Sequence, residues 1–106
     1  MTREEFLKII DEINDKVYSI YDIKEMKIFS SINPVQVAEN LDIDRFRWFL
    51  VSITVYKVGQ WYIGLRGPTI LFSENMDWKD TGYKVMAFEM VEIPSVTYKK
   101  KENPNV

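Results

Sequence analysis

The chain has 106 residues, of which 46% are hydrophobic and 28% charged, with a formal net charge of −2. This length and composition predict one soluble globular domain that buries about two-thirds of the surface of its unfolded chain. The sequence contains neither cysteine nor histidine, which excludes disulfides, catalysis by thiolate or imidazole, and the usual ligands of zinc. There is no apolar run of bilayer length and no secretory signal pattern, so we expect a cytoplasmic location.

The first segment has the pattern of an amphipathic helix. Thr2 and Glu5 have the spacing of a capping box, in which each side chain satisfies a free backbone N–H at the helix start. Apolar residues then recur every three or four positions, at Phe6, Ile9, Ile10, Ile13, Val17 and Ile20. We therefore predict a helix over residues 3–20.

The next segment predicts a second, shorter helix. Residues 21–32 have no clear period, although 28–29 would suit a short strand. Asn33 followed by Pro34 is typical of a helix start, because Asn can cap and Pro is tolerated in the first turn. The apolar side of this helix would consist of Val35, Ala38 and Leu41.

The second half of the chain is rich in aromatic and β-branched residues, which favour strands. We predict a long strand over residues 45–58 and a two-residue hairpin turn, glycine first, at residues 59–60. The return strand starts at residue 61, is interrupted by Gly67-Pro68, and continues or resumes over residues 69–72.

After an acidic loop, residues 83–93 predict a further strand that ends at Pro94, and residues 95–99 suit an edge segment. Helices followed by strands predict an α+β fold, with the N-terminal amphipathic helix and a short second helix packed on one face of a mostly antiparallel sheet of four or five strands. We expect a single domain over residues 1–98 and a flexible basic tail over residues 99–106.

Pairing across the hairpin divides the predicted sheet into two faces. The uncharged face is the expected floor for the helices, and it contains Phe46, Trp48, Leu50, Thr54, Tyr56, Val58, Trp61, Ile63 and Leu65. The other face mixes apolar with basic residues, namely Arg45, Arg47, Phe49, Val51, Ile53, Val55, Lys57, Tyr62 and Arg66. We interpret this second face as half-solvated, with basic stems over the sheet and charged ends in water, in preference to a dedicated binding surface.

Catalytic, metal and nucleic-acid sites find little support. Aromatic and basic residues alternate over residues 45–49, as in single-strand binders, but the chain as a whole is acidic. The acids of residues 73–82 lack the regular alternation of a calcium loop. Glu89 is a candidate carboxylate, although an ion pair with Lys84 or an arginine explains it better. We predict no catalytic residue, metal or cofactor, and hence no enzyme.

The acidic loop SENMDWKDTG, residues 73–82, contains a tryptophan. Trp78 can fold back onto the core with Met76 beside it, or it can remain exposed among acids as a contact for a basic partner. The second interpretation predicts one contact patch, made of Glu74, Met76, Asp77, Trp78 and Asp80. The second-choice patch is Arg45, Arg47, Tyr62 and Arg66.

Our leading hypothesis is a non-enzymatic protein-binding domain that occupies the surface of a partner protein, as small immunity or inhibitor proteins do. We expect neither nucleic acid nor membrane as a partner, and self-association stays open. The alternative is a small-ligand-binding or sensory domain with a pocket between helices and sheet. That pocket would be lined by Tyr18, Tyr21, Trp48, Tyr56 and Trp61.

Overall fold

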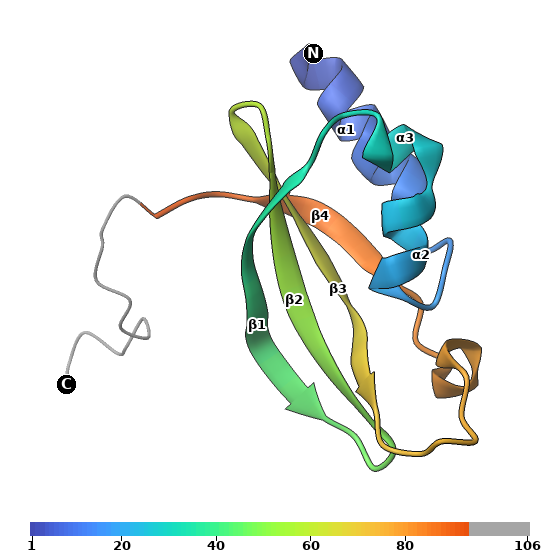
Figure 1. Cartoon of the computed structure of the whole chain (residues 1–106). Coiled ribbons are helices and arrows are strands. Elements are labelled where there is room, and N and C mark those ends of the chain that lie inside the picture. The colour runs from blue at the N-terminus through green and yellow to red at the C-terminus, as the bar shows by residue number, and fades with distance from the viewer. Residues whose placement is uncertain (94–106) are drawn as a thin grey trace, which may run out of the picture.

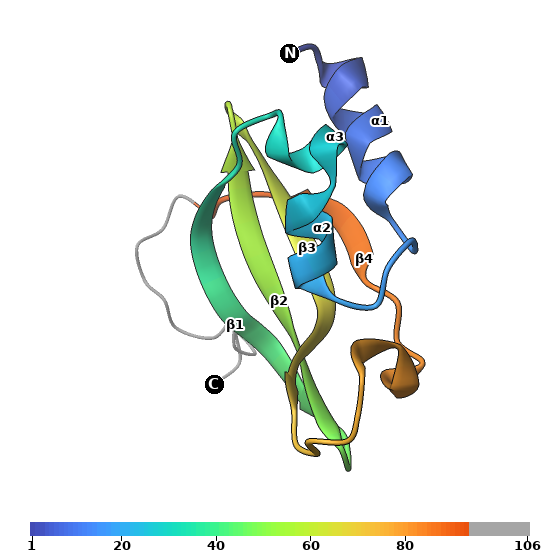
Figure 2. The ribbon, with the colours of Figure 1, turned by 45° about the vertical axis from the view of Figure 1, so that its right-hand side comes forward.

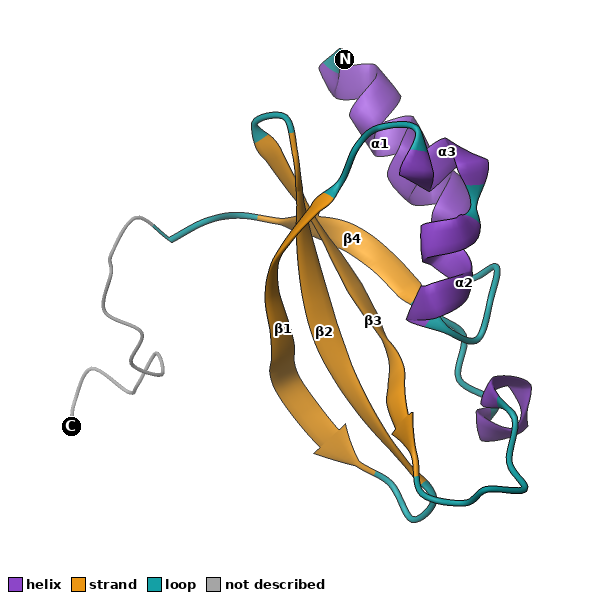
Figure 3. Ribbon diagram, viewed as in Figure 1, coloured by secondary structure: helices purple, strands orange, loops and turns teal. Residues whose placement is uncertain are grey.

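Within residues 1–93, three α-helices precede four strands. The computed structural model describes residues 1–93, and in it the helices pack against one face of a four-stranded antiparallel open sheet (Figures 1 and 3). The strands lie side by side in the order β1-β2-β3-β4, so each pairs with its neighbour in sequence. The predicted α+β class and antiparallel sheet are confirmed.

Helix α1 spans Arg3–Ile13 and starts with the predicted capping box. The Glu5 amide donates to Thr2 Oγ1 at 3.1 Å, and the Thr2 amide donates to Glu5 Oε1 at 2.8 Å. The predicted extension to residue 20 is wrong: the helix ends at Ile13, because the C-cap Asn14 is extended (φ −69°, ψ 134°) and Asp15 then adopts a left-handed φ of 59°. After the helix, the chain forms hydrogen bonds with the segment that precedes β4. The Asp15 amide donates to the Val85 carbonyl, and the Val85 amide donates to the Val17 carbonyl.

Two short helices occupy the segment without a clear period. Helix α2 spans Ile20–Glu25, with the Ser19 hydroxyl accepting from the Tyr21 amide, and helix α3 spans Lys27–Ser30. The short strand suggested at residues 28–29 is therefore wrong. The second helix of the fold precedes Asn33-Pro34 instead of following it.

Strand β1 spans Val35–Arg45, where the sequence predicted a helix. The pairing of β1 with β2 has three register irregularities. Along this pairing, a step of three residues in β1 matches a step of two residues in β2. The pairs are Ala38–Val55, Leu41–Ile53 and Asp44–Val51. Because of these bulges, apolar residues of β1 are spaced three positions apart, and this spacing was interpreted as that of a helix.

Strands β2, Phe49–Val58, and β3, Trp61–Leu71, form the predicted hairpin. Val58 opposes Trp61 as expected, and Gly59 has a left-handed φ of 62°. The predicted strand 45–58 is in fact divided by a turn at residues 46–48. Conversely, β3 runs through Gly67-Pro68 without interruption.

Strand β4 spans Met86–Met90 and is shorter than predicted. It pairs antiparallel with residues 62–66 of β3. The chain just before β4 packs closely on β3, since a Cβ on Gly67 would lie 2.8 Å from Val85 Cγ2. The strand end at Pro94, the edge segment 95–99 and the basic tail 99–106 lie outside the described residues.

The core forms on the predicted uncharged face. Figure 2 shows the three helices on the same side of the sheet, and apolar side chains from both layers are buried between them. The cluster consists of Phe6, Ile13, Ile20, Ile23, Phe29, Tyr56, Val58, Ile63, Leu65, Val85 and Ala87. Phe46 and Trp48 were wrongly placed in this face: they lie in the exposed β1–β2 turn.

The opposite, helix-free face of the sheet is less solvated than predicted. The exposed fractions of Val51, Ile53 and Val55 are only 0%, 9% and 6%. Side chains of the sheet itself provide cover: Phe88 and Met90 of β4 reach within 3 Å of the position that a Cβ on Gly64 would take. Because Gly64 is paired with Val55 in β2, these long side chains fill space that a bulkier residue would occupy.

Candidate functional site

The β1–β2 turn lies at the end of the sheet farthest from α1 (Figure 1). Exposed apolar side chains gather at this turn and at the end of β3. There the β1–β2 turn meets the loop after β3, and the Phe72 amide donates to the Trp48 carbonyl at 2.9 Å. We call this group the aromatic tip and define it as the exposed Phe46, Trp48 and Phe72 together with the half-buried Met76. Trp48 is 50% exposed, which is high for the side chain with the largest apolar surface.

Two predicted arginines flank the aromatic tip. The Arg45 guanidinium lies 4.7 Å from the ring centroid of Phe72, and that of Arg47 lies 4.9 Å from the ring centroid of Trp48. Both distances are within the range of cation–π attraction. The arginines therefore hold two of the exposed rings and leave positive charge at the surface.

Residues of the acidic loop line a shallow hollow beside the tip. Its volume is about 230 Å³, and its walls are Trp48, Ser73, Asn75, Met76 and Asp80. The structure thus brings part of the first predicted patch together with the arginine-bearing turn of the second, a proximity that strand spacing alone did not predict.

Trp78 itself has an intermediate position. It begins a 3₁₀ turn, Trp78–Thr81, and its ring is half-buried 5.8 Å from the ring of Tyr21 in α2. The turn is capped by Asp77, whose amide donates to Asp80 Oδ2 at 2.8 Å. Trp78 consequently anchors the loop to the helix layer, and Glu74 and Asp77 remain exposed.

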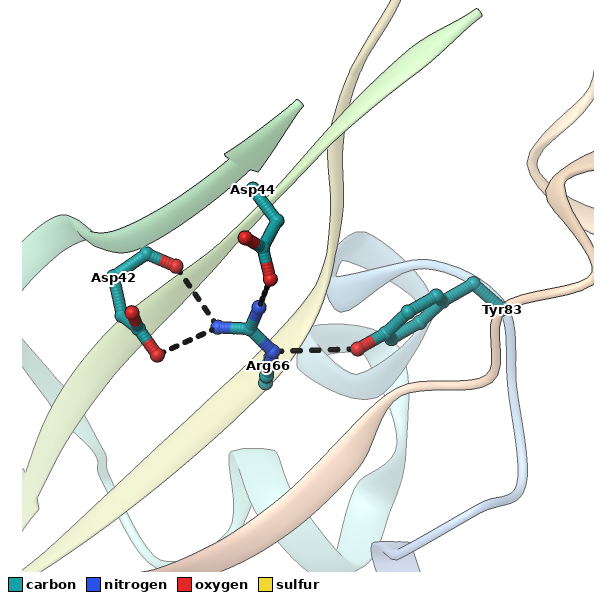
Figure 4. A network of polar contacts seen from close by, with 4 residues as sticks. All are labelled: Asp42, Asp44, Arg66 and Tyr83. Atoms are coloured by element: carbon teal, nitrogen blue, oxygen red, sulfur yellow. Dashed lines mark hydrogen bonds and ion pairs between the residues drawn. The ribbon is translucent and has the colours of Figure 1, made fainter. Parts of the chain in front are cut away.

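Arg66 and Tyr62 lie away from the tip, on the helix-free face. Figure 4 shows Arg66 between two aspartates of β1 and a tyrosine. Its Nη1 donates to the Asp42 carbonyl at 2.9 Å and to Asp42 Oδ2 at 3.1 Å, its Nη2 bonds Asp44, and its Nε donates to the Tyr83 hydroxyl at 3.2 Å. Partial burial disfavours the charge, but the Tyr83 hydroxyl and both aspartates outweigh it and raise the pKa of Arg66. Its donors are engaged within the fold.

Glu89 is an ion-pair partner of an arginine, as the sequence favoured. Arg3 of α1 contacts it with both Nη atoms, each 2.5 Å from one carboxylate oxygen. The hydrogen bond from Arg3 lowers the pKa of Glu89. No three carboxylates among residues 1–93 gather closely enough to hold a metal ion.

A separate cavity of about 140 Å³ lies between α2 and the first three strands. Its lining is Ile20, Tyr21, Lys24, Gln36, Glu39, Asn40, Thr54, Tyr56, Pro68, Thr69 and Ile70. Only two of the five predicted pocket residues, Tyr21 and Tyr56, are among them. Sequence reasoning missed two charged lining residues, Lys24 and Glu39. Lys24 lay in the segment without a clear period, and Glu39 lay in the predicted second helix.

The remaining predicted pocket aromatics have other neighbours. Trp61 packs against Phe6 of α1 at a centroid distance of 5.1 Å. Tyr18 lies 5.8 Å from the Lys84 ammonium, and Trp48 belongs to the tip. The predicted aromatic pocket is therefore divided between a cavity, the core and the surface.

Comparison with known proteins gives no family for this chain. No family model matches it, and neither a curated protein nor a solved structure shows a significant match.

Proposed function

We propose that this protein is a non-enzymatic binding domain that occupies the surface of a partner protein with its aromatic tip, in the manner of a small inhibitor or immunity protein. The observation that carries the proposal is Trp48, half exposed at the rim of a hollow and flanked by Arg47. Tryptophan and arginine are the residues most enriched at binding hot spots, where they combine buried apolar area with directed charge.

Charge at the tip supports a particular kind of partner. Arg45 and Arg47 provide positive charge on the turn, and the exposed acids Glu74, Asp77 and Asp80 provide negative charge on the adjoining loop. A partner with a basic patch opposite the loop would associate faster and in a more defined orientation.

In the described residues no helix is long and apolar enough to cross a bilayer.

Site-specific photocrosslinking tests the proposal in the cell that makes the protein. A photoreactive phenylalanine analogue at position 48 should crosslink one stoichiometric partner. The matched control is position 7, since Leu7 is also exposed and apolar but lies on α1 at the other end of the molecule. Equal crosslinking at both positions, or none at 48, would contradict a binding tip.

Blockade as the mechanism requires a second result. Purified wild-type protein should inhibit the activity of the captured partner, and Trp48→Ala should weaken binding by about 2 kcal/mol or more, the usual effect at a hot spot. A partner that binds normally to Trp48→Ala would place the interface elsewhere. A partner that binds through the tip and keeps its activity would show binding without inhibition.

A further inference from the structure

The cavity beneath α2 combines a buried polar atom with a nearby cation. Only 3% of Tyr56 is exposed, its side chain lines the cavity, and among residues 1–93 no group lies in hydrogen-bonding geometry to its hydroxyl. Most buried polar atoms in proteins are paired, because an unpaired one loses its hydration without compensation. A bound molecule would supply the missing partner.

Lys24 supplies the charge at the same place. Its ammonium lies 5.6 Å from the ring centroid of Tyr21 and 5.8 Å from that of Tyr56, and it forms no ion pair within residues 1–93. Burial raises the pKa of Tyr56, and the Lys24 ammonium acts to lower it, both as a hydrogen-bonding neighbour of the hydroxyl oxygen and by its charge. The net rise keeps the proton on the hydroxyl, which can donate it at neutral pH. The Tyr56 hydroxyl and the solvent-exposed Lys24 ammonium are thus two donors, one of them charged, that adjoin the cavity.

We propose that this cavity binds a small carboxylate, whose oxygens accept from the Tyr56 hydroxyl and from the Lys24 ammonium. Thr54 and Thr69 belong to the same lining, and Tyr21 adds an aromatic surface. A volume of about 140 Å³ suits a compact molecule, since an apolar cavity of about 150 Å³ holds benzene.

The β1 side of the cavity limits which carboxylates can bind. Glu39 and Gln36 of β1 lie there, and the Gln36 amide donates to Glu39 Oε2 at 3.2 Å. Glu39 would repel a second negative charge but would attract an ammonium group. The cavity therefore excludes dicarboxylates, and it admits either a simple monocarboxylate or a small amino acid.

Titrations followed by two-dimensional amide NMR test the site. The probes are acetate, benzoate, glycine and alanine, each at millimolar concentration and compared with its primary amide, which lacks the carboxylate charge. We expect saturable shifts at the cavity residues with one carboxylate class and none with the amides. Benzoate without the amino acids would identify a simple carboxylate, and the reverse would identify an amino acid.

Two variants assign the contacts. Tyr56→Phe and Lys24→Gln should each weaken binding by about tenfold, which is typical of losing a hydrogen bond to a charged group. Lys27→Gln, on α3 and outside the cavity lining, is the matched control and should bind like wild type. Trp48→Ala should also bind normally, which separates this site from the proposed tip.

Tyr56→Phe has a further use, because it removes an unpaired hydroxyl and keeps the ring. We expect its melting temperature to equal or exceed that of wild type in the absence of ligand. A large drop in melting temperature would show that the hydroxyl has a structural partner and would overturn the proposal. So would the absence of any saturable shift with these four carboxylates, or tight binding that survives Tyr56→Phe.

Discussion

Arg66 shows how one side chain can stabilise a sheet face that no helix covers. It is opposite Ile53 of β2 in the register, and its contacts lie on Asp42 and Asp44 of β1. The side chain therefore crosses β2 and covers Ile53 with its stem, which accounts for apolar burial on the open face. An arginine suits this place because its planar fork can bond several acceptors at once.

Arg66→Met tests this function of the guanidinium while keeping most of the stem. We expect a loss of roughly 1–2 kcal/mol in the free energy of unfolding, moderated because both aspartates are exposed and water can solvate them. Urea denaturation measures the change. Arg47→Met at the tip is the control and should change the free energy of unfolding by less than about 0.5 kcal/mol. Equal effects of the two variants would argue against a stabilising function of the Arg66 guanidinium.

Glu89 should make stability depend on acid pH. Arg3 lowers its pKa below the ordinary 4.5, so the folded state binds this proton less readily than the unfolded state. The resulting stabilisation is present above pH 4.5 and is lost as the pH falls through the lower, folded value.

Thermal melts across the acid range should therefore show a smaller loss on acidification for Glu89→Gln than for wild type. Asp11→Asn, at an exposed position on α1, is the control and should follow the wild-type curve. Parallel curves for Glu89→Gln and wild type would mean that the Arg3 contact adds no stability in solution.

At the scale of elements, β1 is an edge strand that its own backbone makes irregular. Asn40 and Asp42 have left-handed φ values of 58° and 47°, and the register with β2 shifts three times. Such bulges bend a strand and interrupt its row of free backbone groups, which hinders pairing with a foreign strand. They also position Asp42 to reach Arg66.

The left-handed conformation of Asn40 can be tested by substitution. Asn40→Val should destabilise the fold by roughly 1–2 kcal/mol, because a β-branched residue is strained at positive φ. Asn40→Gly, which adopts this conformation without strain, should be close to wild type. Chemical denaturation compares the two, and equal stability of Val and Gly at this position would show that β1 changes its path in solution.

In the whole molecule, the helix-covered core and the aromatic tip proposed to bind a partner protein are located at different ends. The helices cover the end of the sheet near the β2–β3 turn, and the aromatic tip projects at the other end (Figures 1 and 2). The three tryptophans divide accordingly: Trp61 packs on α1, Trp78 anchors a loop to α2, and Trp48 is exposed.

This division predicts graded effects of substitution on folding. Trp61→Ala should lower the free energy of unfolding by about 2 kcal/mol or more, because it leaves a void against Phe6. Trp48→Ala should change it by less than about 0.5 kcal/mol, because few neighbours lose a contact. Calorimetry on both proteins measures the difference, and a strongly destabilised Trp48→Ala would identify the tip as structural.

Local sequence patterns were sufficient for some elements and misleading for others. The capping box at Thr2 and the turn at Gly59 were predictable because adjacent residues determine their geometry. The end of α1 was not, because the competing partner of residues 15–17 is the backbone of Val85, distant in sequence. The helix predicted after Asn33 failed because bulges changed the period of β1.

The sequence by itself determined the α+β class, the hairpin register and the apolar face that receives the helices, since these follow from periodicity and turn chemistry within neighbouring residues. Only the tertiary structure placed Trp48 beside Met76, Arg66 between two aspartates, and Lys24 near Tyr56. Each of these contacts joins separate elements, and their meeting depends on how the strands twist, bulge and pack. Spacing along a chain contains no measure of that packing, so the candidate sites emerged from the fold.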